Sequence, residues 1–196
     1  LHLCNKNMVK MDTNNNDGKA KNDLLLDVCM AAKYEGATIK THYTPHKATY
    51  GDSASQLCTV LARSFADIGD IVRGRDLYSG NSKEKKKRGQ TERDQLEQKL
   101  KEIFAKIHEK LTTANGVKSR YKGDENYFQL REDWWTVNRD QVWEAITCHA
   151  GDSDEYFRKT PCGGGNLTYN KCRCTKTSDN VNIVPTYFDY VPQFLR

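Results

Sequence analysis

The chain has 196 residues, of which 37% are hydrophobic, and a formal net charge of +5 from 31 basic against 26 acidic side chains. A chain of this length is expected to bury a real hydrophobic core in one or two compact units. Its apolar runs are short and interrupted by charge, which excludes a transmembrane helix of about 20 apolar residues. Because the chain opens at Leu1 without an initiator methionine or a leader, we interpret it as part of a longer protein whose signal or anchor lies elsewhere.

Seven cysteines in so polar a chain predict disulfides and an oxidising, extracellular setting. The disulfide candidates are Cys4, Cys29, Cys58, Cys148, Cys162, Cys172 and Cys174. The number is odd, so at least one thiol is free or has lost its partner, and we favour Cys4 because it lies near the start of the chain. Two alternatives stay open: buried free thiols, and a zinc site, which the lack of paired CxxC spacing disfavours. Its ligands would come from Cys148, His149, Cys162, Cys172 and Cys174.

The first predicted helix follows a polar surface loop over Lys10–Asn22. Residues Asp23–Lys33 hold a dense run of leucine, valine, cysteine and alanine, which suits a helix packed on more than one side. Gly36 lies just beyond the expected end of this helix, where glycine is a common stop.

A second helix is predicted after Asp52 and Ser53, either of which can cap its free amide groups. Its apolar residues recur at steps of three and four and form one stripe that ends at Gly74. The stripe comprises Leu57, Val60, Leu61, Ser64, Phe65, Ile68, Ile71 and Val72. We expect most of the charged residues on the opposite side to face solvent, namely Arg63, Asp67, Asp70 and Arg73.

The next stretch is poor in hydrophobic residues and carries a basic run from Lys83 to Arg88, as in a mobile, solvated loop. Thr91 and Asp94 then form an approximate capping box that predicts the start of a third helix. Its apolar stripe and the stop that follows are Leu96, Leu100, Ile103, Phe104, Ile107 and Leu111, then Asn115 and Gly116.

A further helical region is predicted over Asn126–Cys148, and it holds all three tryptophans. The pattern allows a break near Asn138 into two shorter helices. After Cys148 the composition changes to glycine, serine, threonine and cysteine, which indicates a cysteine-pinned loop, and the aromatic tail PTYFDYVPQFLR stays unassigned. The predicted fold class is all-α, a disulfide-stabilised helical bundle with long loops.

No residue pattern indicates catalysis. Cys148 adjoins His149, but neighbouring residues on a helix point in different directions, so a disulfide cysteine beside a surface histidine is the better interpretation. Glu132 and Asp133 lie about 100° apart around a helix, which favours capping or ion pairing over an acid–base pair. The glycines at 163–165 lack the lysine and hydroxyl residue of a phosphate-binding loop. We therefore predict that the chain is not an enzyme and needs no cofactor or metal.

The excess positive charge is concentrated in one segment and points to binding. In an extracellular setting the available polyanions are sulfated or sialylated glycans rather than nucleic acid. The predicted glycan- or receptor-binding residues are Arg73, Arg75, Lys83, Lys85, Lys86, Lys87 and Arg88. The alternative is a basic loop that is merely solvated and has no partner.

Two further features fit a role in binding or glycosylation and also fit a purely structural role. The rings of Trp134, Trp135 and Trp143 can stack on sugars, yet their helical spacing favours a place in the core. Asn166 begins a glycosylation sequon with Leu167 and Thr168, which suits a surface loop.

Seven segments together carry a resemblance to one family. They are CNKNMVKMD, KNDLLLDVCMAAKYEG, SQLCTVLARSFADIGDIVRGRDLY, LREDWWTVNRDQVWEAITC, CGGG, NKCRC and VPTYFDYVPQFLR. In this order they resemble the alpha class of Duffy-binding-like domains of the malaria parasite's variant erythrocyte membrane protein one. The resemblance extends over nearly the whole chain.

The resemblance implies a helical bundle in disulfide-linked subdomains. Residues 1–50 would be the end of the first subdomain and the lead-in to the helical core. Residues 51–196 would be the second subdomain, cut before a third, with variable surface at Ser79–Lys122 and Asp152–Asn182.

It also implies a function in adhesion, on the extracellular face of the infected erythrocyte and subject to antigenic variation. The implied partners are erythrocyte or endothelial receptors, sulfated glycans, antibodies and neighbouring domains of the parent protein, with no nucleic acid. Some domains of this class mediate rosetting, whereas others support an adjoining cysteine-rich domain that binds the receptor. A structural, antigenically variable spacer is therefore the alternative function.

Overall fold

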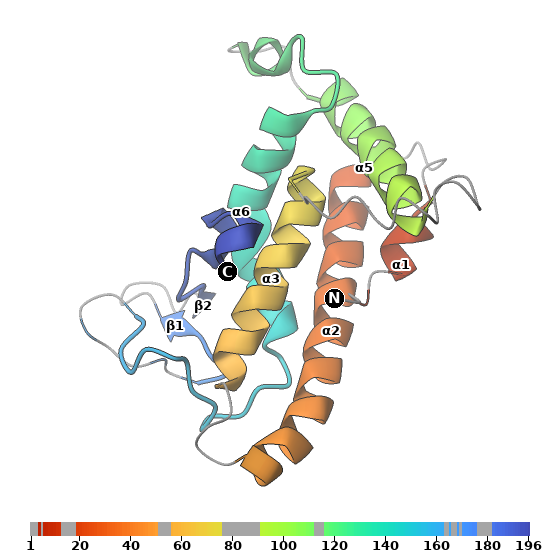
Figure 1. Ribbon diagram of the computed structural model, residues 1–196. Coiled ribbons are helices and arrows are strands. Elements are labelled where there is room, and N and C mark those ends of the chain that lie inside the picture. Colours follow the sequence, from red (N-terminus) through yellow and green to blue (C-terminus); the bar gives the residue numbers. More distant parts are fainter. Residues whose placement is uncertain are drawn as a thin grey trace.

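The computed structural model describes residues 4, 6–12, 19–50, 56–75, 91–111, 116–162, 165, 168, 170–175 and 182–196. This part of the chain is mostly helical, which confirms the predicted all-α class (Figure 1). The α-helices are α1 (Lys6–Val9), α2 (Ala20–Tyr50), α3 (Leu57–Arg73), α5 (Glu92–Glu109) and α6 (Phe128–Ile146). Short 3-10 helices are η3 (Lys118–Tyr121), η5 (Phe188–Tyr190) and η6 (Gln193–Leu195).

Three helices form the centre of the fold. Helices α2 and α6 run in the same direction, and α3 runs against them, in contact with both (Figure 1). Helix α5 packs on α2 and α6, and η5 lies on α3. The strands β1 (Cys174–Thr175) and β2 (Asn182–Ile183) form one antiparallel pair, a small departure from a purely helical chain. No helix in the described part is both long and apolar enough to span a bilayer.

Helix α2 is much longer than the predicted Asp23–Lys33 segment, because Gly36 does not end it. A Cβ atom at Gly36 would lie 1.9 Å from the carbonyl oxygen of Ile146, at the end of α6. The glycine is thus required where two helix backbones approach closely, and not as a stop. Beyond it, residues 44–49 are exposed, and the helix includes Pro45 and extends past α3 and α6 (Figure 1).

Helix α3 ends as predicted, at Gly74, whose φ of 71° is readily adopted only by glycine. Its expected caps, Asp52 and Ser53, lie outside the described residues, and the residue before the helix is Gln56, which makes no side-chain cap. The ring of Phe65 packs in the core at centroid distances of 5.1 Å from Trp135 and 5.2 Å from Trp143.

The capping box of α5 is confirmed. The backbone N–H of Asp94 donates to Thr91 Oγ1 at 3.2 Å, and the Thr91 N–H donates to Asp94 Oδ2 at 3.0 Å. The predicted stripe of this helix is buried from Leu96 to Ile107, and the helix itself ends at Glu109.

Helix α6 is continuous, so the break expected near Asn138 does not occur. The buried Asn138 side chain donates to the carbonyl oxygen of Trp134 at 2.7 Å, one turn earlier, and so finds its partner within the helix. All three tryptophans are at most 4% exposed, which places them in the core and not on a sugar-binding surface.

Two disulfides tie the loops after α6 to the rest of the fold. Cys58 on α3 is bonded to Cys172, and Cys162 is bonded to Cys174. The free thiols are those of Cys4, which we favoured as unpaired, and of Cys29 and Cys148. The disulfides predicted for Cys29 and Cys148 are therefore wrong, and Cys148 Sγ instead lies 3.0 Å from Nδ1 of the adjacent His149. The zinc alternative loses three of its five ligands, Cys162, Cys172 and Cys174, to these disulfides.

Candidate functional site

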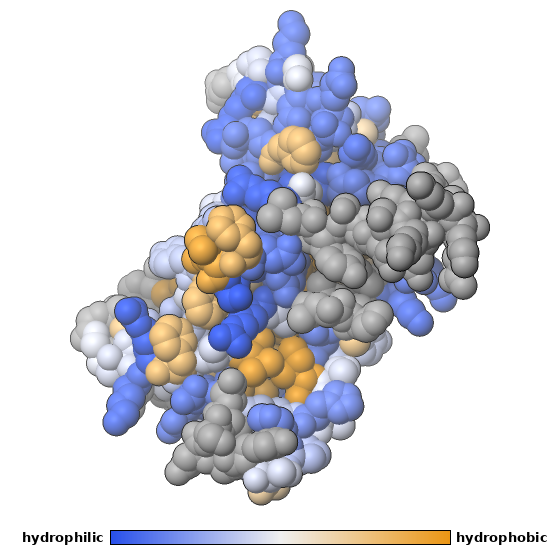
Figure 2. All heavy atoms as spheres, in the orientation of Figure 1, coloured by the Kyte–Doolittle hydropathy of each residue, from blue (hydrophilic) through white to orange (hydrophobic). Residues whose placement is uncertain are grey.

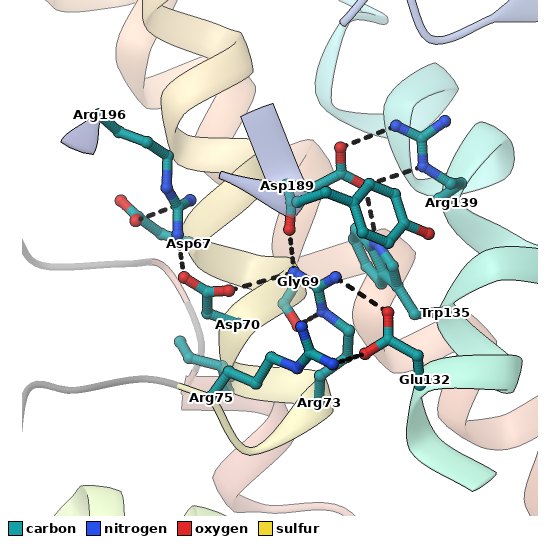
Figure 3. Close-up of polar contacts among 12 residues, drawn as sticks. Asp67, Gly69, Asp70, Arg73, Arg75, Glu132, Trp135, Arg139, Asp189 and Arg196 are labelled. Carbon is teal, nitrogen blue, oxygen red and sulfur yellow. Dashed lines mark hydrogen bonds and ion pairs between the residues drawn. The ribbon is translucent and has the colours of Figure 1, made fainter. Parts of the chain in front are cut away.

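Arg73, which we expected to face solvent and to contact a ligand, is buried, with a side chain only 1% exposed. Its guanidinium group donates to Asp70 at 3.1 Å, to Glu132 at 3.3 Å and to the main-chain oxygen of Asp189 (Figure 3). Its expected place at the surface is therefore wrong. The stripe pattern failed here because Asp70 and Arg73, three residues apart on α3, form an ion pair with each other and so can both be buried.

Asp189 on η5 is the centre of this polar network. Its carboxylate accepts hydrogen bonds from Trp135 Nε1 at 2.9 Å and from Arg139 Nε and Nη2, each at 2.8 Å (Figure 3). Arg139 also donates to the main-chain oxygen of Thr186 at 2.9 Å. The network fixes the segment that carries η5 to both α3 and α6.

The last residue, Arg196, lies between two carboxylates on α3. It pairs with Asp67 at 3.5 Å and also with Asp70 (Figure 3). Burial raises the pKa of both carboxyl groups, although the positive charge of Arg196 acts in the opposite direction. The aspartates that we expected in solvent instead hold the end of the chain in place.

Arg75 is the predicted contact residue that does lie at the surface, with a side chain 57% exposed. It pairs with Glu132 at 2.7 Å, and Glu132 also pairs with the buried Arg73 (Figure 3). One carboxylate is thus shared by a buried and an exposed arginine. This arrangement can offer a positive group to an anion, and it contains no nucleophile or proton-transfer pair.

The other predicted contacts, Lys83, Lys85, Lys86, Lys87 and Arg88, lie outside the described residues. Asn166 lies outside them as well. Of the seven residues predicted to form the binding surface, the structure therefore places two, Arg73 in the core and Arg75 at the surface.

The sequence did not reveal the exposed hydrophobic side chains of the C-terminal segment. Tyr187 is 74% exposed, Phe194 74% and Leu195 66%, whereas Asp189 between them is 1% exposed. Figure 2 shows apolar spheres gathered where this segment covers α3 and α6. The one cue in the sequence was an acidic residue between aromatic ones, in YFDY, and it did not show which of these side chains would be buried.

The family model described as the Duffy binding domain matches residues 1–196, the whole chain. This chain belongs to the Duffy binding domain family. It is 42% identical, with a TM-score of 0.73, to the N-terminal NTS-DBL1α and CIDRγ double domain of the PfEMP1 protein from the Plasmodium falciparum varO strain. It is 30% identical, with a TM-score of 0.67, to the ICAM-1-binding DBLβ domain of PfEMP1 IT4var13.

Both alignments cover 99% of this Duffy binding domain, but only 25% of the double-domain chain and 39% of the DBLβ chain. The chain thus spans less than half the length of either solved structure. No match was found among curated proteins. The resemblance drawn from the seven segments is confirmed at the level of the family and of its PfEMP1 members.

Proposed function

We propose that this Duffy binding domain is an extracellular adhesion module of a PfEMP1-type variant antigen, which binds a host-cell receptor or sulfated glycan and catalyses no reaction. The observation that carries the proposal is the match over the whole chain, together with 42% identity to a PfEMP1 double domain. The parent protein would be displayed on the surface of the infected erythrocyte, with antigenic variation in the loops.

The proposed contact is Arg75 with the basic residues that follow it in the chain, Lys83 and Lys85–Arg88. Arg75 is exposed at the end of α3, and the charge of this segment favours a sulfated polyanion. Arg73 is not part of the contact, because its charge is already compensated in the core by Asp70 and Glu132.

The test is binding of the purified chain to heparin and to erythrocytes, with and without heparinase treatment of the cells. Binding to heparin should weaken steeply as salt rises, because exposed charges are screened over about 10 Å at 0.1 M salt. Replacement of Lys85, Lys86 and Lys87 by alanine should abolish retention on heparin at moderate salt. The matched control replaces three exposed lysines on other elements, Lys33, Lys47 and Lys110, and should retain binding. Equal binding by both triple variants would remove this contact assignment.

The second candidate function is a structural, antigenically variable spacer that supports a neighbouring receptor-binding domain. The similar PfEMP1 structure favours it, since there a DBL1α domain is joined to a CIDRγ domain. This function predicts that the isolated chain binds neither erythrocytes nor heparin, whereas a longer protein with the neighbouring domain binds cells.

A further inference from the structure

Two aromatic rings form an apolar platform on the surface, at a distance along α3 from Arg75. The ring of Phe157 is parallel to that of Phe188, with an interplanar angle of 5° and centroids 6.1 Å apart. Phe157 is 51% exposed, and the ring of the buried Tyr156 packs against both, with centroids 5.0 Å from Phe157 and 6.3 Å from Phe188. Phe157 thus keeps about half of its surface in water although its ring packs against Phe188 and Tyr156.

The platform is fixed to the beginning of α3 by its backbone. The N–H of Phe157 donates to Thr59 Oγ1 at 2.9 Å, and the N–H of Cys58 donates to the carbonyl oxygen of Glu155 at 3.1 Å. Cys58 is in turn bonded to Cys172. Because the backbone is held on both sides of Tyr156, little conformational entropy is lost when a partner covers the rings.

Three exposed cations lie on the two segments that meet at these rings. The Arg158 guanidinium carbon lies 6.0 Å from the Phe157 ring centroid, Lys159 follows it in the chain, and Arg63 lies one turn beyond Thr59 on α3. Burial raises the pKa of the Tyr156 hydroxyl, and the fields of Arg158 and Arg63 oppose that rise, in keeping with their position beside the rings.

These cations are not compensated by ion pairs. Within the described part of the chain, no ion pair involves Arg63, Arg158 or Lys159, although Glu155 is exposed three residues before Arg158 and Asp67 lies one turn after Arg63 on α3. The surface therefore combines uncovered aromatic area with excess positive charge.

We propose that this aromatic–basic surface, made of Arg63, Phe157, Arg158, Lys159 and Phe188, binds an acidic segment of another protein. An apolar side chain of the partner covers the two phenylalanine rings, and its carboxylates pair with the three cations. Aromatic residues and arginine are enriched in protein interfaces, and opposite charges at the rim accelerate association and select the partner.

A peptide fits this surface better than a saccharide does. Sugar hydroxyls need several neutral hydrogen-bonding side chains around the stacking ring, whereas the groups beside Phe157 are cations and a second apolar ring. The proposal is independent of the adhesion contact at Arg75 and the basic segment, because the two surfaces share no residue.

The test uses the whole chain and three fluorescent peptides, of alternating glutamate and leucine, glutamate and serine, or lysine and leucine. We expect saturable binding of the glutamate–leucine peptide alone. The double variant Arg63→Glu and Arg158→Glu should weaken it by about tenfold or more, as should Phe157→Ser. The charge-matched control, Lys33→Glu with Lys47→Glu, should bind as the unmodified chain does.

Circular dichroism and the two intact disulfides serve as the check that each variant is folded. Equal loss of binding in the control variant would overturn the proposal, since net charge alone would then explain the result. It is also overturned if a heparin oligosaccharide protects Arg63 and Arg158 from chemical modification while the glutamate–leucine peptide does not. The variants of Lys85, Lys86 and Lys87 should bind the glutamate–leucine peptide as the unmodified chain does, even if they no longer bind heparin. Failure of the proposed adhesion function and failure of this inference can therefore be told apart.

Discussion

Asp189 receives donors from two different side chains of α6, and its main chain accepts from Arg73 on α3. A carboxylate that is completely buried is tolerated only when its charge is paired and its oxygens are hydrogen-bonded. Here both conditions are met by Arg139 and Trp135. The same residue therefore determines where the exposed Tyr187 and Tyr190 lie.

Replacement of Asp189 by alanine should lower the free energy of unfolding by about 3–5 kcal/mol, because the buried Arg139 loses its counter-ion. Chemical denaturation monitored by tryptophan fluorescence measures the change. Asp152→Ala, at an exposed carboxylate, is the control and should change stability by at most about 0.5 kcal/mol. A loss for Asp189→Ala as small as that of the control would show that the network does not stabilise the fold.

Cys29 should react slowly with alkylating reagents. Burial, and then the negative charge of Glu144, raise the pKa of its thiol from 9.0 to about 11. The thiolate is the reactive form, so its population at pH 8 falls on the order of one hundredfold relative to an ordinary thiol. Alkylation with mass-spectrometric readout should show Cys29 lagging behind Cys148, and its rate should still be rising above pH 10. Equal rates for the two thiols at pH 8 would contradict this prediction.

Among the elements, α2 and α6 depend on a single glycine for their close contact. Replacement of Gly36 by alanine places a methyl group within 1.9 Å of the Ile146 carbonyl oxygen, which the backbone can relieve only by moving the helices apart. We expect a loss of about 1–3 kcal/mol in the free energy of unfolding, despite the better helix propensity of alanine. The control Lys33→Ala, at an exposed position of the same helix, should be close to neutral. A gain in stability for Gly36→Ala would show that the helices separate at no cost.

The sequence predicted those elements whose signals are local. The Gly74 stop and the Thr91–Asp94 box depend on neighbouring residues alone, and both are confirmed. The apolar stripe of α3 is also local and is buried at Leu61, Phe65 and Ile68, whereas the solvent exposure expected of its charged side is not found at Asp70 and Arg73. The continuation of α2 through Gly36 depends on α6, more than 100 residues away in the chain, and no local pattern contains it. The same holds for Arg73, whose burial depends on a carboxylate of α6 and on the carbonyl of Asp189.

At the scale of the whole molecule, the two disulfides constrain very different lengths of chain. Cys58 and Cys172 are separated by 114 residues, whereas Cys162 and Cys174 are separated by 12. Removal of the longer link by Cys58→Ala with Cys172→Ala should therefore cost about 2 kcal/mol more than removal of the shorter one, if loop-closure entropy dominates. Thermal or urea unfolding of the two double variants measures the difference. A greater loss from the shorter link would assign the stabilisation to local packing instead.

Glu132 gives the surface a property that neither of its arginines has alone. If an anionic ligand of the kind we propose displaces Arg75, the Glu132 carboxylate keeps a positive neighbour in the buried Arg73. Release of Arg75 therefore does not leave the Glu132 carboxylate without a counter-ion. The exposed Arg75 can therefore leave Glu132 and pair with another acidic group while the ion pair between Glu132 and Arg73 beneath it stays in place.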